Sequence, residues 1–160
     1  MTPHQLSQEP IVKVGMLIRK PISEVFEAFV DPEVSTNFWF TKSSGRLDTS
    51  KEVTWEWEMY GASAQVRVKE IDRNKRIVIE WGQSGKTDVV EWEFTPFGKE
   101  ATYVQITNSA FPEEGDKMVE RALDAASGFT TVLDGAKAWL EYGIRLNLVA
   151  DKYPAQSAED

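Results

Sequence analysis

Alternation of hydrophobic and polar residues is the strongest pattern in this chain. Across residues 53–59, tryptophan, valine and methionine recur at every second position, with polar residues such as Thr54 and Glu56 between them. Residues 77–81 repeat this alternation. Because successive side chains of a strand point to opposite faces, the pattern predicts strands with one apolar face and one hydrated face.

Several such segments, separated by short turns, predict an antiparallel sheet. The connections contain glycine, asparagine, aspartate and proline, which favour tight turns, and short connections favour antiparallel neighbours. The expected strands cover residues 11–18, 44–48, 53–59, 62–71, 76–81, 87–95 and 101–108.

Helical spacing appears on both sides of this strand region. Pro21 suits the first position of a helix, and Asp31 suits the N-cap of a second short helix that starts at Pro32 and reaches about residue 38. A long C-terminal helix is expected from about Asp116, with Gly128 as a candidate break. Its apolar stripe consists of Phe129, Val132, Ala136, Trp139, Leu140 and Gly143.

These elements predict an α+β fold in which a curved antiparallel sheet wraps around the long C-terminal helix. One domain over residues 11–152 accounts for the pattern, with residues 1–10 and 153–160 as flexible termini. Residues 125–128 of the helix are all small. They either leave a cavity beneath the helix or let the helix approach the strands closely, and the sequence supports both alternatives equally.

Composition narrows the classes of function. The net charge is −8 and the pI is near 4.8, which argues against binding of nucleic acid. The chain has no cysteine, which excludes disulfides and a cysteine nucleophile. No apolar run reaches the roughly 20 residues that span a bilayer, and the first ten residues lack a signal-peptide pattern. We therefore expect a soluble cytoplasmic protein without membrane insertion.

Residues for catalysis or metal binding are scarce. The only histidine is His4, in the expected flexible N-terminus, so no histidine base or multi-histidine metal site is expected. The carboxylate pairs 56/58 and 91/93 alternate with aromatic residues and should lie on the hydrated face. The sequence thus favours a role without catalysis, and we assign no catalytic residue, metal or cofactor.

Residues 82–87 end in Gly-Lys-Thr, as phosphate-binding loops do. The first glycine of that motif would fall at position 80, which is Glu80, and strand-like residues follow where a helix should begin. We interpret the segment as a hairpin turn.

The order of motifs resembles the helix-grip fold of the START and Bet v 1-like superfamily (SRPBCC), and within it the family named after the activator of the Hsp90 ATPase. The resemblance rests on Pro21 with Val25-Phe26, Asp31-Pro32-Glu33, Trp39-Phe40, Val53-Thr54-Trp55-Glu56-Trp57, the segments 68–72, 76–81, 89–96 and 101–104, Gly128-Phe129, Leu133 and Trp139-Leu140. It implies a sheet of about six to seven strands and binding of apolar molecules. Two departures matter: residues 50–52 replace a glycine common at the cavity mouth, and the chaperone-binding domain of the family's namesake has no counterpart here.

The aromatic residues are the candidate binding site. Five of them should lie on the inner face of the sheet, and the resemblance implies that the other four lie on elements that close over it. Together they would offer stacking surface and polar edges to a planar, mostly apolar guest. An ordinary core is the alternative for each. The nine candidates are Trp39, Phe40, Trp55, Trp57, Trp81, Trp92, Phe94, Phe111 and Phe129, and polar contacts from Tyr60, Tyr103, Gln105 and Thr107 are a further expectation.

Three functions are compatible with these features. The first is a domain that binds an apolar, aromatic or lipid-like small molecule in an internal cavity. The second is a co-chaperone or stress-response module that binds a protein partner such as a chaperone, or forms a homodimer through a free sheet edge. The third is a cyclase- or aromatase-like enzyme that acts by positioning its substrate.

Overall fold

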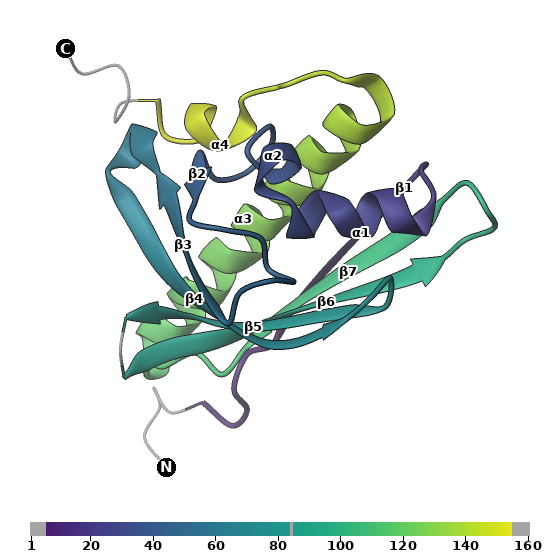
Figure 1. Cartoon of the computed structure of the whole chain (residues 1–160). Helices are drawn as coiled ribbons and strands as arrows, with labels where there is room; N and C mark the ends of the chain where they lie inside the picture. Colours follow the sequence, from purple (N-terminus) through teal and green to yellow (C-terminus); the bar gives the residue numbers. More distant parts are fainter. Residues whose placement is uncertain (1–5, 84, 155–160) are drawn as a thin grey trace.

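A computed structural model of the chain describes residues 6–83 and 85–154, which form a curved seven-stranded antiparallel sheet around a long helix (Figure 1). The strand order is β1-β7-β6-β5-β4-β3-β2. This confirms the predicted α+β helix-grip fold. In chain order the elements are β1 (Val12–Ile18), α1 (Ile22–Val30), α2 (Pro32–Ser35), β2 (Lys42–Ser43), β3 (Glu52–Trp57), the 3₁₀ turn η1 (Glu58–Tyr60), β4 (Ala62–Asp72), β5 (Arg76–Gln83), β6 (Lys86–Pro96), β7 (Thr102–Ser109), α3 (Gly115–Tyr142) and α4 (Leu148–Asp151).

The register of the sheet places the alternating hydrophobic residues on its concave face. Trp92 lies opposite Ile77 on one side and Ile106 on the other, so the three share a face. Trp55 and Trp92 are each 1% exposed. The indole rings therefore belong to the interior beneath α3, as the period-two pattern predicts.

The two short helices are fixed by their first residues. Pro21 is the N-cap of α1, one position before the expected one. Asp31 caps α2, and its carboxylate accepts a hydrogen bond from the Glu33 N–H at 3.0 Å. The α2 helix ends at Ser35, earlier than the predicted residue 38, because the N–H groups of Asn37 and Phe38 bond three residues back, which tightens the chain out of α geometry.

The strand predicted at residues 44–48 is wrong. The structure instead has the two-residue strand β2, which pairs with β3 just before this segment. Arg46 turns toward the helices and forms ion pairs with Glu27 at 2.5 Å, Asp31 at 3.5 Å and Asp48 at 2.9 Å. These contacts hold the segment off the sheet, which a local alternation pattern cannot reveal.

The long helix α3 runs unbroken through Gly128, so the candidate break does not occur. It lies against the concave face of the sheet (Figure 1), and its Lys137 Nζ donates to the Leu17 carbonyl of β1 at 2.7 Å. The helix ends at Gly143, whose positive φ of 66° gives a left-handed cap that favours glycine. Beyond it, α4, which the sequence pattern did not predict, returns to the tip of the β3–β4 hairpin.

The Gly-Lys-Thr segment forms the predicted hairpin. Gly82 pairs with Thr87 and Gln83 pairs with Lys86 across β5 and β6. His4 and most of the segments expected to be flexible, residues 1–5 and 155–160, lie outside the described residues. Across residues 6–83 and 85–154, no helix is long and apolar enough to cross a membrane.

Candidate functional site

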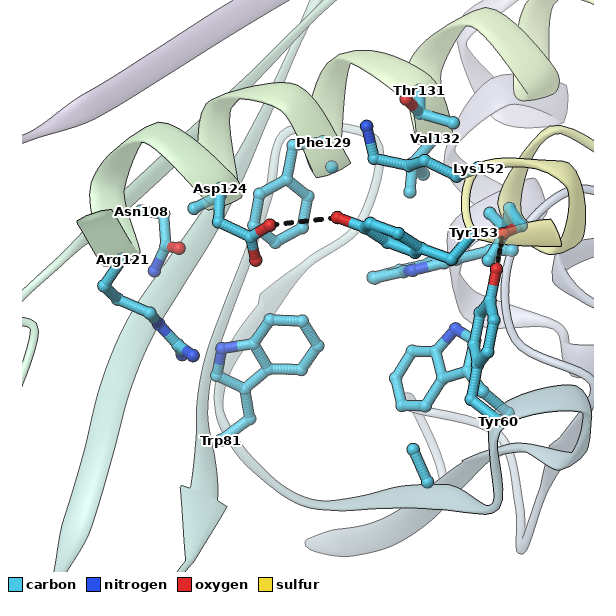
Figure 2. A pocket seen from close by; sticks show the side chains of 16 residues that line it. Tyr60, Trp81, Asn108, Arg121, Asp124, Phe129, Thr131, Val132, Lys152 and Tyr153 are labelled. Atoms are coloured by element: carbon cyan, nitrogen blue, oxygen red, sulfur yellow. Dashed lines mark hydrogen bonds between the residues drawn. The ribbon is translucent and has the colours of Figure 1, made fainter. Parts of the chain in front are cut away.

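A pocket of about 300 Å³ lies between the concave face of the sheet and α3, with α4 at its rim (Figure 2). The sheet side contributes residues of β3, η1, β4, β5 and β7, and Trp39 enters from the segment after α2. The lining residues are Trp39, Trp57, Tyr60, Ala62, Trp81, Asn108, Arg121, Asp124, Ala125, Gly128, Phe129, Thr131, Val132, Val149, Lys152 and Tyr153.

Aromatic rings form the apolar wall of the pocket. The Trp81 and Phe129 ring centroids are 5.7 Å apart, and the Trp39 ring lies 6.2 Å from Trp81 and 6.1 Å from Phe129. Trp57 extends the wall, with its ring 6.4 Å from that of Trp81. Tilted and edge-on contacts of this kind fix the rings against each other and leave their remaining faces for a guest.

Four of the nine predicted aromatic residues thus line the pocket: Trp39, Trp57, Trp81 and Phe129. The other five do not. Phe40 stacks on Trp55 at 4.7 Å behind the wall, and Trp92 and Phe94 pack against Phe29 of α1. Phe111 belongs to a separate small cluster with Val12, Met118 and Ala122. These five rings are covered by other side chains of the core.

The small residues of α3 create the space. A Cβ atom added at Gly128 would meet no atom within 4 Å, whereas one at Gly135, two turns further on, would lie 3.2 Å from Phe38 Cβ and 3.3 Å from the Phe38 carbonyl oxygen. Of the two alternatives left by the sequence, the helix therefore leaves room at Gly128, and its close approach at Gly135 is to Phe38 and not to the strands.

A buried carboxylate organises one end of the pocket. Asp88 of β6 is 1% exposed and accepts hydrogen bonds from Trp81 Nε1 at 2.8 Å and Asn108 Nδ2 at 2.6 Å. Its other oxygen accepts from Arg121 Nη2 of α3 at 2.6 Å. Three donors, of which Arg121 also forms an ion pair, offset the cost of burying the charge, and the hydrogen bonds hold Trp81 and Asn108 in fixed orientations.

Sequence reasoning missed this network, although a signal exists. Asp88 and Asn108 occupy positions of β6 and β7 whose neighbours in the alternation, Val90 and Ile106, are apolar and fully buried. A polar residue whose place in the alternation points it to the inner face of the sheet requires a buried hydrogen-bond partner. Its place in the alternation therefore marks it as a member of a buried polar network.

The rim joins α4 to both walls. Tyr60 donates hydrogen bonds to the carbonyl oxygens of Val149 and Ala150, while Lys152 donates to Ser127 of α3. Tyr153 donates to Asp124 at 3.3 Å, and the Asp124 charge raises the pKa of the Tyr153 hydroxyl. Tyr153 falls in the segment predicted to be a flexible terminus, and that division of the chain stays a prediction.

The remaining polar candidates lie elsewhere. Tyr60 lines the pocket, but Tyr103, Gln105 and Thr107 alternate with the buried residues of β7 and face the outer side of the sheet. Glu91 also lies outside the pocket. Burial raises its pKa, the nearby Glu93 adds to the rise, and Arg76 at 2.8 Å opposes it. Within the part of the chain that the structure describes, no group of His, Cys, Asp and Glu is arranged to hold a metal ion.

Comparison with known proteins agrees with the architecture. The sequence model of the family described as "Activator of Hsp90 ATPase homolog 1-like protein" matches residues 19–141. A search of curated proteins finds no match.

Three solved structures share the fold. The protein SSP2350 from Staphylococcus saprophyticus is 28% identical, with a TM-score of 0.73 over 86% of this chain and 96% of that one. The Aha1 dimer from Colwellia psychrerythraea is 16% identical, with a TM-score of 0.68 over 84% of this chain and 98% of that one. A START superfamily protein from Mycobacterium smegmatis is 16% identical, with a TM-score of 0.60 over 81% of this chain and 98% of that one.

Proposed function

This chain belongs to the family of Activator of Hsp90 ATPase homolog 1-like proteins, and we propose that it binds an apolar, aromatic small molecule in the pocket beneath α3. The observation that carries the proposal is the open space at Gly128, opposite a wall of tryptophan and phenylalanine rings. A helix optimised only for core packing would fill this position with a larger side chain.

The size of the pocket limits the guest. At about 300 Å³ it lies at the lower end of ligand-sized cavities, which favours a compact guest of two or three fused rings over a long-chain lipid. The lining suits such a molecule, because the rings of Trp39, Trp57 and Trp81 offer stacking surfaces. The proposal assigns binding and no chemical step.

Entry to the pocket involves α4. Its contacts to the walls are hydrogen bonds from Tyr60, Lys152 and Tyr153, and the two tyrosine rings meet at 6.1 Å. Tyr153 is half exposed. A rim closed by a few side-chain contacts can open at lower cost than the sheet or α3, so we place the entrance there.

A neutral fluorescent probe, N-phenyl-1-naphthylamine, tests the proposal. Titration into the native protein should give saturable fluorescence enhancement at a stoichiometry of about one, with quenching of tryptophan emission. Gly128→Leu places a side chain in the pocket and should weaken binding by at least roughly tenfold. The matched control is Thr130→Leu, which adds a leucine to the exposed side of the same helix and should bind the probe as the unaltered protein does.

Two results would contradict the proposal. One is the absence of saturable binding by the native protein. The other is equal binding by Gly128→Leu and Thr130→Leu, which would place the probe on the surface. The co-chaperone, homodimer and positioning-enzyme alternatives stay predictions.

A further inference from the structure

The amide of Asn108 has a buried oxygen that is left without a protein donor. Asn108 is 1% exposed and lines the pocket, and among residues 6–83 and 85–154 no group donates to its Oδ1. The orientation of the amide is fixed, because Nδ2 donates to two acceptors, Asp88 Oδ2 at 2.6 Å and the Val89 carbonyl at 2.8 Å. A residue of the pocket wall therefore holds an acceptor that the described part of the chain leaves unsatisfied.

Arg121 supplies a donor at the same end. Its Nη2 is paired with Asp88, but its Nε is buried and has no acceptor within the described part of the chain. Figure 2 shows Asn108, Arg121 and Trp81 together at one end of the pocket, opposite Tyr60 and Lys152. A hydroxyl group matches this pair of neighbours, because one oxygen atom can donate to an amide oxygen and accept from a guanidinium.

The charges around the pocket balance. Arg121 is neutralised by the buried Asp88, and the rim carries one acidic and one basic residue, Asp124 and Lys152, each hydrogen-bonded to an uncharged side chain. A charged group at the inner end of the pocket would lose its hydration without gaining an uncompensated partner of opposite sign. The pocket therefore suits an uncharged molecule.

We propose that the guest is an uncharged planar aromatic alcohol of the phenol class, whose hydroxyl donates to Asn108 Oδ1 while its rings lie against Trp81 and Phe129. This inference rests on the proposed binding function and deepens it by naming the chemical class and the direction of the guest. The hydroxyl lies at the inner end, beside Asn108 and Arg121, and the rings extend toward α4.

Matched probes test the inference on the native protein. Dissociation constants are measured by calorimetry or tryptophan quenching for 2-naphthol, for 2-methoxynaphthalene, which has the same rings but no donor, and for 2-naphthoate, which is charged. We expect 2-naphthol to bind roughly three- to tenfold more tightly than 2-methoxynaphthalene, the range that one added hydrogen bond to a neutral group gives. The carboxylate should bind more weakly than 2-naphthol.

A variant then tests whether Asn108 causes the difference in affinity between 2-naphthol and 2-methoxynaphthalene. Asn108→Leu removes the acceptor at similar size, and it should bring the affinities of 2-naphthol and 2-methoxynaphthalene together. The matched control is Gln105→Leu, the same exchange on the outer face of β7, which should leave the difference unchanged. Because the comparison of the two neutral probes uses only the native protein, it tests the preference for a hydroxyl even where Asn108→Leu folds poorly.

The outcomes separate the two proposals. If 2-naphthol and 2-methoxynaphthalene bind the native protein equally, and both are lost in Gly128→Leu, the proposed binding function stands and the assignment of a phenol is overturned. A difference that survives in Asn108→Leu also overturns the assignment. If none of the three probes binds the native protein, both proposals fail together.

Discussion

Replacing each of two glycines on the same helix by alanine should stabilise the protein at one position and not at the other. Gly128 and Gly135 both lie inside α3, so each alanine removes the same helix-propensity penalty of about 0.5–1 kcal/mol. That gain is common to both variants and cancels when they are compared. The difference between them therefore measures only what the new methyl group meets.

The surroundings of the two positions set the size of that difference. At 128 the methyl enters open space, so Gly128→Ala should raise the free energy of unfolding by about 0.5–1 kcal/mol. At 135 the methyl would lie 3.2 Å from Phe38 Cβ, with the Phe38 backbone equally close, and such overpacking costs about 1–3 kcal/mol. Gly135→Ala should therefore be neutral or destabilising by up to about 2 kcal/mol.

Urea denaturation followed by far-UV circular dichroism measures both variants against the unaltered protein. For a chain of this length, the stabilisation by Gly128→Ala should also raise Tm by about 2–4 °C per kcal/mol in a thermal scan. Equal stabilisation by the two substitutions would refute the reasoning, because it would mean that a methyl group at 135 does not crowd Phe38 and meets as much open space as one at 128.

Three further predictions concern contacts of α3 and α4. Arg121→Met should lower the free energy of unfolding, measured by urea denaturation, by about 2 kcal/mol, because it leaves the buried Asp88 carboxylate without its ion-pair partner. The partial exposure of Arg121 keeps the loss below that of a fully buried pair, and an unchanged free energy of unfolding would contradict the prediction. Burial opposes ionisation of Glu141, but the Arg19 N–H and Lys137 hold its pKa below the ordinary value. Glu141→Gln should therefore destabilise the protein at pH 7 and progressively less below about pH 4. If urea denaturation gives the same loss of stability at every pH, the prediction is wrong. Tyr60→Phe should speed amide hydrogen exchange in 148–151 without changing exchange in the sheet, and unchanged exchange there would show that the tyrosine does not hold α4.

The fold was readable from the sequence because its main determinants are local. Alternation in β3 and β5 and the Asp31-Pro32 helix start each depend on residues close together in the chain. The failed strand at 44–48 shows the limit of this approach. There Arg46 reaches 19 residues back to Glu27, and this tertiary contact overrides the local pattern.

The pocket was only partly readable for the same reason. Trp55 and Trp57 have identical local patterns, yet Phe40 stacks on Trp55 and removes it from the cavity while Trp57 stays at the wall. The polar end joins Asp88 to Arg121, which are 33 residues apart. Which inward-facing side chains remain uncovered is decided by such distant contacts, and residue periodicity carries no record of them.

One helix carries much of what a guest would touch. Arg121, Ala125, Gly128 and Val132 follow one another at intervals of three or four along α3, while the sheet beneath them holds the fold together. The α3 residues that would set selectivity for the proposed guest are therefore separate from the strands that determine the architecture. If the pocket binds a guest as proposed, randomising codons 125, 128 and 132 while keeping Arg121, which holds Asp88 of the sheet, would alter the guest preference on an unchanged β scaffold.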